Sequence, residues 1–293
     1  VGNIAQVLRD QGRLTESEEL FTESLRIVDS EGVDPAVRAL LLMNLSGLYI
    51  QTRRFERAES VLNEVLALCR EQFGPDSAEM ANGLRNLGVL YARKRDFKAA
   101  EDSLKKALAI GEKQMGSRPR DLASILTSLA GVYTMRKDWN KAEPLLARAI
   151  NVLQLSFGSD HPGVSDALIN LGELYVQRGS PTLGEDAFRR ALTIRLRLFG
   201  AEESGVADIS SRLAILLTNQ KRYEEAKAFF LAALPIQERL LGSNAPEFAG
   251  TLEQYAKLLR KMENVSQAEA MEIRASSIRA RNSFTVSTEQ LPR

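Results

Sequence analysis

The chain is poor in the residue types that build most metal sites and disulfide-linked folds. It has one cysteine, Cys69, so no disulfide can form within the chain, and one histidine, His161, so no site can hold two histidines. No apolar run approaches the roughly 18 residues that a membrane-spanning helix needs. Charge is balanced at 39 Lys and Arg against 38 Asp and Glu. This balance argues against a general role in binding nucleic acid or a membrane surface.

Catalytic and nucleotide-binding motifs are absent from the sequence as well. It contains neither G-x-x-x-x-G-K-[ST] nor G-x-G-x-x-G, so no phosphate-binding loop is predicted. A Ser/His/Asp triad would have to use His161, which falls in a loop between repeats and is better explained as a loop or cap residue. Cys69 lies beside Leu68 and reads as a small buried hydrophobe. We therefore predict no catalytic residue, no metal, no cofactor and no enzyme activity.

The composition suits a folded protein in a reducing compartment. Apolar residues make up 44% of the chain, which is ample for a buried core. The single cysteine favours a cytoplasmic location. The chain begins at Val1, without an initiator Met and already inside a helical pattern, so we expect that a preceding segment has been removed.

Several sets of residues recur with a period of 42, which is the main signal in the sequence. Similar six-residue segments begin at Asn44, Asn86, Ser128, Asn170, Arg212 and Gln254. Small residues recur at Ala58, Ala100, Ala142, Gly184, Ala226 and Ala268, and loop glycines recur at Gly74, Gly116, Gly158, Gly200 and Gly242. Each period contains two amphipathic stripes with helical spacing. The period therefore predicts stacked helical hairpins.

The ends of the helices can also be predicted. Each loop glycine follows an apolar stripe, where a left-handed residue would stop the helix. Nearby polar side chains are candidates to cap the next helix. These N-cap candidates are Asp76, Ser159, Asp160, Ser243 and Asn244.

The order of these motifs resembles the 42-residue tetratricopeptide repeats of kinesin light chains, nephrocystin-3-like proteins and many bacterial repeat proteins. The pattern N-L-x-x-L-Y, then A-E-x-L and F-G-x-D-H-P carries the likeness, most closely at 141–146 and 157–162. The resemblance covers residues 1 to about 280. It implies an all-α superhelix, or solenoid, that binds other proteins.

The pattern predicts about six full hairpins after a partial N-terminal one. We expect a solenoid over residues 1–281 and a polar, disordered tail over 282–293. The expected repeats are 1–35, 36–75, 76–117, 118–159, 160–201, 202–243 and 244–281.

Some positions depart from the family pattern. Arg53, Arg95, Lys137 and Lys221 replace the usual turn glycine, which remains only as Gly12 and Gly179. The repeat with Gly179-Ser180-Pro181 and Gly184 lacks the usual aromatic, so we expect the loosest hairpin there. Pro235 predicts a kink in its helix. Glu272, at a position normally apolar, marks the last repeat as a cap.

The open face of the first helices is the candidate binding surface, because stacked hairpins leave it uncovered. Polar side chains recur on this face, and amides there can bond the main chain of a bound peptide. The predicted partner-binding residues are Asn44, Gln51, Arg85, Asn86, Arg93, Asn170, Gln177, Arg212, Asn219, Gln254 and Lys261. We expect mixed charge on this face, with the arginines opposing Asp166, Glu173, Asp208 and Glu253.

Three functions fit this sequence. The first is an interaction scaffold that binds a protein segment or peptide, with no nucleic acid or membrane involved. The second is the regulatory repeat region of a larger enzyme or signalling protein. The third is a structural or self-assembling array. The sequence identifies neither the partner nor the oligomeric state.

Overall fold

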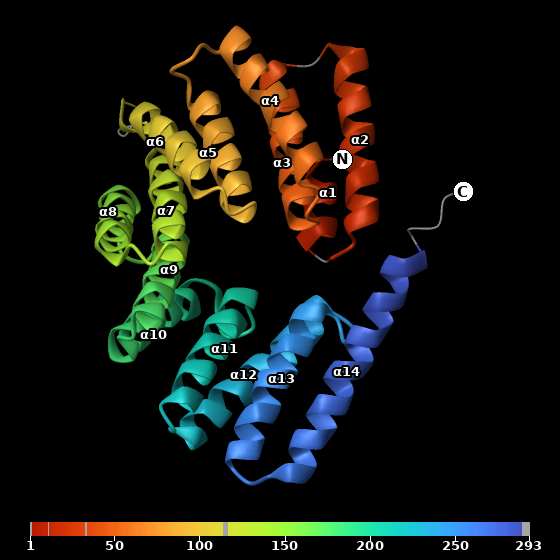
Figure 1. Ribbon diagram of the computed structural model, residues 1–293, viewed down its shortest axis with the longest axis vertical. Coiled ribbons are helices and arrows are strands. Elements are labelled where there is room, and N and C mark those ends of the chain that lie inside the picture. Colours follow the sequence, from red (N-terminus) through yellow and green to blue (C-terminus); the bar gives the residue numbers. More distant parts are fainter. Residues whose placement is uncertain (1, 11, 33, 114–116, 289–293) are drawn as a thin grey trace. The chain divides into compact units, whose positions relative to one another are not determined.

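The computed structural model describes residues 2–10, 12–32, 34–113 and 117–288. These residues form 14 helices and no strand, which confirms the predicted all-α class. The chain divides into two compact units, Val1–Ser159 (unit 1) and Asp160–Arg293 (unit 2), and the border falls at a predicted repeat boundary. Each unit is a stack of helical hairpins, as Figure 1 shows.

Unit 1 contains four hairpins. Its helices are α1 (Gly2–Asp10), α2 (Leu14–Glu31), α3 (Pro35–Gln51), α4 (Phe55–Gln72), α5 (Ala78–Arg93), α6 (Phe97–Lys113), α7 (Pro119–Met135) and α8 (Trp139–Phe157). Each odd-numbered helix packs against its own even-numbered partner, and from α3 onward also against the even-numbered helix before it. The odd-numbered helices of successive hairpins also touch one another, so they form one face of the stack.

Unit 2 contains three hairpins. Its helices are α9 (Pro162–Arg178), α10 (Pro181–Phe199), α11 (Ser204–Asn219), α12 (Tyr223–Leu241), α13 (Pro246–Lys261) and α14 (Val265–Thr288). The last helix continues to Thr288, past residue 282 where the sequence predicted a disordered tail. No glycine or proline stands between Val265 and Thr288 to end it. Residues 289–293 lie outside the described residues.

Small residues on the first helix of a hairpin make room for large ones on the second. A Cβ on Gly88 would lie 2.5 Å from Cγ of Leu104. A Cβ on Gly172 would lie 2.6 Å from Cε1 of Phe188. Leu104 and Phe188 are both buried. Glycine therefore lets the two helices approach closely.

The α9–α10 hairpin is tightly packed, which corrects the expectation that it is the loosest. A Cβ on Gly184 would lie 2.7 Å from Cγ2 of Val176 and 3.1 Å from the carbonyl oxygen of Gly172. Phe188 supplies aromatic bulk in this hairpin, although the usual aromatic position holds Pro181. The sequence interpretation counted the missing aromatic and overlooked the close approach that Gly184 permits.

Most turns inside the hairpins use a left-handed residue that is not glycine. Arg53, Arg95, Lys137, Lys221 and Glu263 have φ between 59° and 66°. Gly12 and Gly179 hold the equivalent positions at φ 78° and 87°. A side chain in this conformation costs roughly 1–2 kcal/mol. The turn is therefore imposed by the packing of the two helices.

The loop glycines between hairpins also have positive φ, but they are not left-handed helical residues as predicted. Gly158, Gly200 and Gly242 combine φ of 86°, 79° and 90° with ψ of 168°, −178° and 152°. Only glycine populates this region readily. Gly116 lies outside the described residues.

In two helices the N-cap lies one residue after a predicted candidate. The Oγ of Ser77 accepts a hydrogen bond from Met80 N–H at 3.1 Å, one residue after Asp76. Nδ1 of His161 accepts from Gly163 N–H at 3.1 Å, one residue after Asp160, which agrees with the interpretation of His161 as a loop or cap residue. The candidates Asp76 and Asp160 instead form ion pairs with later helices. A helix start can therefore be placed from sequence only to within a residue or two.

Two sets of ion pairs recur along the hairpins. One set joins neighbouring hairpins: Glu59–Lys94 at 2.8 Å, Glu101–Arg136 at 2.6 Å and Glu185–Arg222 at 2.6 Å. The other joins the end of a hairpin to the loop at its own beginning: Asp76–Lys113 at 2.9 Å, Asp160–Arg197 at 3.4 Å and Glu202–Arg239 at 2.5 Å. In the terminal hairpin Glu272 pairs with Arg260 at 2.7 Å, which suits a water-facing cap.

Two helices contain internal prolines. α8 continues through Pro144, and α12 continues through Pro235, where a kink remains a prediction. In the described segments, every helix is too short or too polar to cross a membrane.

Candidate functional site

A cavity of about 760 Å³ opens on the face of unit 1 where α1, α3 and α5 meet. We call it the unit-1 cavity. Its lining consists of Arg9, Met43, Asn44, Gly47, Ile50, Gln51, Arg53, Phe55, Arg85, Asn86, Val89 and Arg93. The volume is in the range of sites that bind ligands or peptide side chains.

The repeat itself brings the polar side chains of this cavity together. Asn44 and Gln51 lie seven residues apart on α3, and Asn86 and Arg93 lie seven apart on α5. Residues seven apart share one face of a helix. Because α3 and α5 are equivalent helices of neighbouring hairpins, the two pairs face the same space. With Arg85, all five unit-1 residues predicted from the sequence line one cavity.

The unit-1 cavity is positively charged rather than mixed. Its described lining contains four arginines and no Asp or Glu. Arg85 is half-buried, and its Nε is buried without a hydrogen-bond partner among the residues that the structure describes. Loss of hydration lowers the pKa of the Arg85 guanidinium, and the charge of Asp121 opposes this effect. The expectation of mixed charge is therefore wrong for this part of the face.

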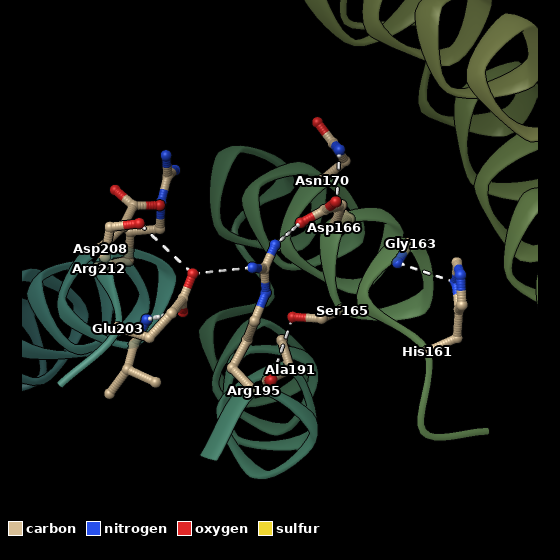
Figure 2. A network of polar contacts seen from close by, with 12 residues as sticks. His161, Gly163, Ser165, Asp166, Asn170, Ala191, Arg195, Glu203, Asp208 and Arg212 are labelled. Atoms are coloured by element: carbon tan, nitrogen blue, oxygen red, sulfur yellow. Dashed lines mark hydrogen bonds and ion pairs between the residues drawn. The ribbon is translucent and has the colours of Figure 1, made fainter. Parts of the chain in front are cut away.

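Unit 2 places its predicted residues in a different setting, shown in Figure 2. Nε of Arg212 donates to Asp208 at 2.8 Å, and the same guanidinium pairs with Glu173. Nδ2 of Asn170 donates to the main-chain oxygen of Asp166 at 2.8 Å. These side chains already have partners, so they are less available to a ligand than those of the unit-1 cavity.

A second arginine, which the sequence interpretation did not single out, holds this part of unit 2 together. Arg195 bridges Asp166 at 2.5 Å and Glu203 at 3.1 Å, from α10 to α9 and to the start of α11 (Figure 2). Burial raises the pKa of the Asp208 carboxyl, an effect that Arg195 opposes. Burial also lowers the pKa of Arg212. These residues therefore form a network of ion pairs between the helices of unit 2.

The other predicted residues of unit 2 lie outside this network. Gln177, Asn219 and Lys261 are exposed at the C-terminal ends of their helices, and Gln254 is half-buried in the middle of α13. They lie on α9, α11 and α13, the first helices of the three hairpins. None of them lines the unit-1 cavity.

Two arginines of the cavity were missed as site residues. Arg9 comes from α1, and its guanidinium lies 3.4 Å from where a Cβ on Gly47 would stand. Arg53 follows α3 in a left-handed turn, which carries its side chain to the cavity. The replacement of a turn glycine by Arg53 was visible in the sequence, but the position of Arg9 depends on how α1 docks on α3.

The two residues that could suggest catalysis have structural roles. Cys69 is fully buried, and burial raises the pKa of its thiol to about 11. His161 caps α9 through Nδ1. Over the described residues, no group of three or more His, Cys, Asp or Glu side chains could hold a metal ion.

Comparison with known families and structures agrees with this architecture. The family model for the tetratricopeptide repeat matches residues 37–113, 121–197 and 205–281, and a second tetratricopeptide repeat model matches residues 2–28. A search of curated protein sequences gave no match.

Solved structures with similar folds have low sequence identity to this chain. BtubC (BKLC) from P. vanneervenii is 20% identical, with 79% of this chain and 92% of that chain covered and a TM-score of 0.67. A putative kinesin light chain from Podosopora anserina is 18% identical, with 70% and 97% covered and a TM-score of 0.56. A Rap protein complexed with Competence and Sporulation Factor is 14% identical, with 90% and 80% covered and a TM-score of 0.58.

These structures share the fold, and the repeat matches span most of the sequence. The protein belongs to the tetratricopeptide repeat family.

Proposed function

We propose that this protein is an interaction scaffold and that the unit-1 cavity binds an extended or helical segment of a partner protein. The observation that carries the proposal is the convergence of Asn44, Gln51, Asn86, Arg85 and Arg93 on one cavity. Amide side chains offer both a donor and an acceptor, and so can hydrogen-bond the main chain of a bound segment. The arginines add charged donors beside them.

The fold supports this proposal in a general way. Repeat stacks present long surfaces made from equivalent positions, and such surfaces suit elongated ligands. One structural neighbour, a Rap protein, was solved in complex with Competence and Sporulation Factor. Another neighbour is a putative kinesin light chain. Tetratricopeptide proteins generally act as scaffolds, which favours binding over catalysis.

A peptide-binding experiment tests the proposal. Peptides selected on the full chain from a random library would be titrated against the wild type and the double variant Asn86→Ala/Arg93→Ala. We expect the double variant to lose about tenfold or more in affinity, because it removes an amide pair and a charged donor. Its melting temperature should change by only a few degrees, since Arg93 is exposed and Asn86 half-buried.

Arg70→Ala is the matched control for this experiment. Arg70 is exposed on α4 of the same unit and does not line the cavity. Affinity for the selected peptides should be unchanged in this variant. If the double variant bound every selected peptide as tightly as the wild type, the cavity would not be the binding site.

A further inference from the structure

The described lining of the unit-1 cavity carries a cluster of positive charge. Four guanidinium groups come from three places: Arg9 on α1, Arg53 in the turn after α3, and Arg85 and Arg93 on α5. No carboxylate is among the described lining residues. Cations held close together repel one another, and their combined field attracts an anion that enters the cavity.

Two other arginines of unit 1 pair with carboxylates. Arg38 pairs with Asp29 and Glu64 at 2.8 and 2.7 Å. Arg54 lies one residue after Arg53 and pairs with Glu18 at 2.7 Å. Carboxylates are therefore plentiful around the stack, whereas none is among the described residues that line the cavity.

Arg85 gives the most direct indication of a missing partner. Its Nε is buried and makes no hydrogen bond among the described residues. The charge of Asp121, which acts on Arg85, comes from α7, outside the lining. A buried donor of a charged group without an acceptor is costly, so an oxyanion that reached Arg85 would be bound strongly.

The number of donors favours a phosphate group over a carboxylate. A phosphate ester carries a charge of about −1.5 to −2 at pH 7 and three acceptor oxygens, whereas a carboxylate carries one charge and two oxygens. Guanidinium forks match phosphate oxygens in pairs, and the amides of Asn44 and Asn86 add further donors. The cavity of about 760 Å³ also leaves room for residues on either side of a modified side chain.

We propose that the unit-1 cavity binds a phosphate group carried by a side chain of the partner segment. The proposal rests on the proposed function, since it assigns the chemistry of the segment that the same cavity receives. Arg85 is the central donor, Arg9 and Arg93 complete the charge, and Asn44 and Asn86 hold the phosphate oxygens or the adjacent main chain.

Inorganic phosphate is the first probe, used with the full chain. We expect saturable binding by calorimetry and a rise in melting temperature that acetate and chloride do not produce at matched ionic strength. Arg85→Ala and Arg93→Ala should each weaken phosphate binding about tenfold or more, while Arg70→Ala should not. Arg93 is exposed, so its variant folds even if replacement of half-buried Arg85 disturbs the cavity.

The pH dependence supplies an independent measurement. The second pKa of phosphate is about 6, so affinity should fall as pH is lowered from 7.5 to 5.5. The described lining contains no histidine or carboxylate, and the carboxylate whose charge acts on Arg85, Asp121, lies outside the lining on α7. The fall should therefore follow the titration of the ligand.

Two further ligands identify the source of the phosphate. An acetylated phosphoserine amide should bind more tightly than inorganic phosphate, and the unphosphorylated serine amide should not bind. Acetate as effective as phosphate, or phosphate affinity unchanged in both arginine variants, would overturn the proposal. If inorganic phosphate and the phosphoserine amide did not bind while the selected peptides still depended on Asn86 and Arg93, the proposed function would stand and this inference would fail.

Discussion

At the scale of single residues, the turns inside hairpins and the loops between hairpins differ in whether they require glycine. Inside a hairpin the left-handed residue is often a long cation such as Lys221, at φ 65°. Between hairpins, Gly200 has φ 79° and ψ −178°, and a Cβ there would meet no atom within 4 Å. The turn at Lys221 accepts a side chain at a cost in conformational free energy. The backbone conformation of Gly200 by itself excludes a side chain.

Substitutions at these two positions should therefore have opposite signs. Lys221→Gly should raise the free energy of unfolding by about 0.5–1 kcal/mol, because relief of the left-handed strain exceeds the entropy cost of glycine. Gly200→Ala should lower it by about 1–3 kcal/mol. Urea unfolding followed by circular dichroism measures both. A neutral Gly200→Ala variant would show that the loop can adopt another conformation without loss.

At the scale of helices, packing within a hairpin depends on pairs of small and large residues. Gly172 faces Phe188 in α9–α10, and Ala130 and Leu146 hold the equivalent positions in α7–α8. The larger side chain on α10 thus meets the smaller residue on α9. The two positions form one packing unit.

A double-mutant cycle tests this coupling. Gly172→Ala alone should destabilise the protein by about 1–3 kcal/mol, because its Cβ would meet the Phe188 ring. In a Phe188→Leu background the same change should become neutral or stabilising, since alanine favours helix over glycine by up to about 1 kcal/mol. Gly250→Ala on α13 is the control, because a Cβ there meets nothing within 4 Å. Strictly additive effects would refute the coupling.

The helices themselves could be predicted from the sequence, whereas details of their ends and of the site could not. The period of 42 aligned the segments that begin at Asn86 and Asn170 and contain Gly88 and Gly172, because a repeating apolar stripe determines which face is buried. It missed the cap Ser77 by one residue. It also predicted mixed charge over the whole face, because it could not tell that Arg212 has acidic partners while the Nε of Arg85 has no hydrogen-bond partner in the described part of the chain.

At the scale of the whole molecule, the ion pairs between hairpins connect folding to pH. In unit 1, Glu101 receives hydrogen bonds from Lys105, Tyr133 and Arg136 at 2.7, 2.8 and 2.6 Å. These contacts, chiefly the one from Lys105, lower the pKa of Glu101 to about 2. The contact from Lys94 likewise lowers the pKa of Glu59.

A carboxyl with a lowered pKa in the folded protein stabilises it above the unfolded pKa of about 4.5, and this stability is lost as the pH falls toward 2. Glu101→Gln should therefore lower the free energy of unfolding at pH 7 by about 2 kcal/mol, with a smaller difference at pH 3. Thermal unfolding across this pH range measures the effect. A difference that did not depend on pH would contradict the assignment.

The spacing of the ion pairs also bears on how such a chain can change in length. Removing residues 77–118, one full period, would place Arg136 where Lys94 now stands, opposite Glu59. The chain would resume at residue 119, which is equivalent to residue 77, so the shortened chain keeps an ion pair between the hairpins at the new junction. Unequal recombination in whole periods therefore preserves the contacts between hairpins, whereas Arg85 and Arg93 of the unit-1 cavity would be lost and replaced by Thr127 and Met135.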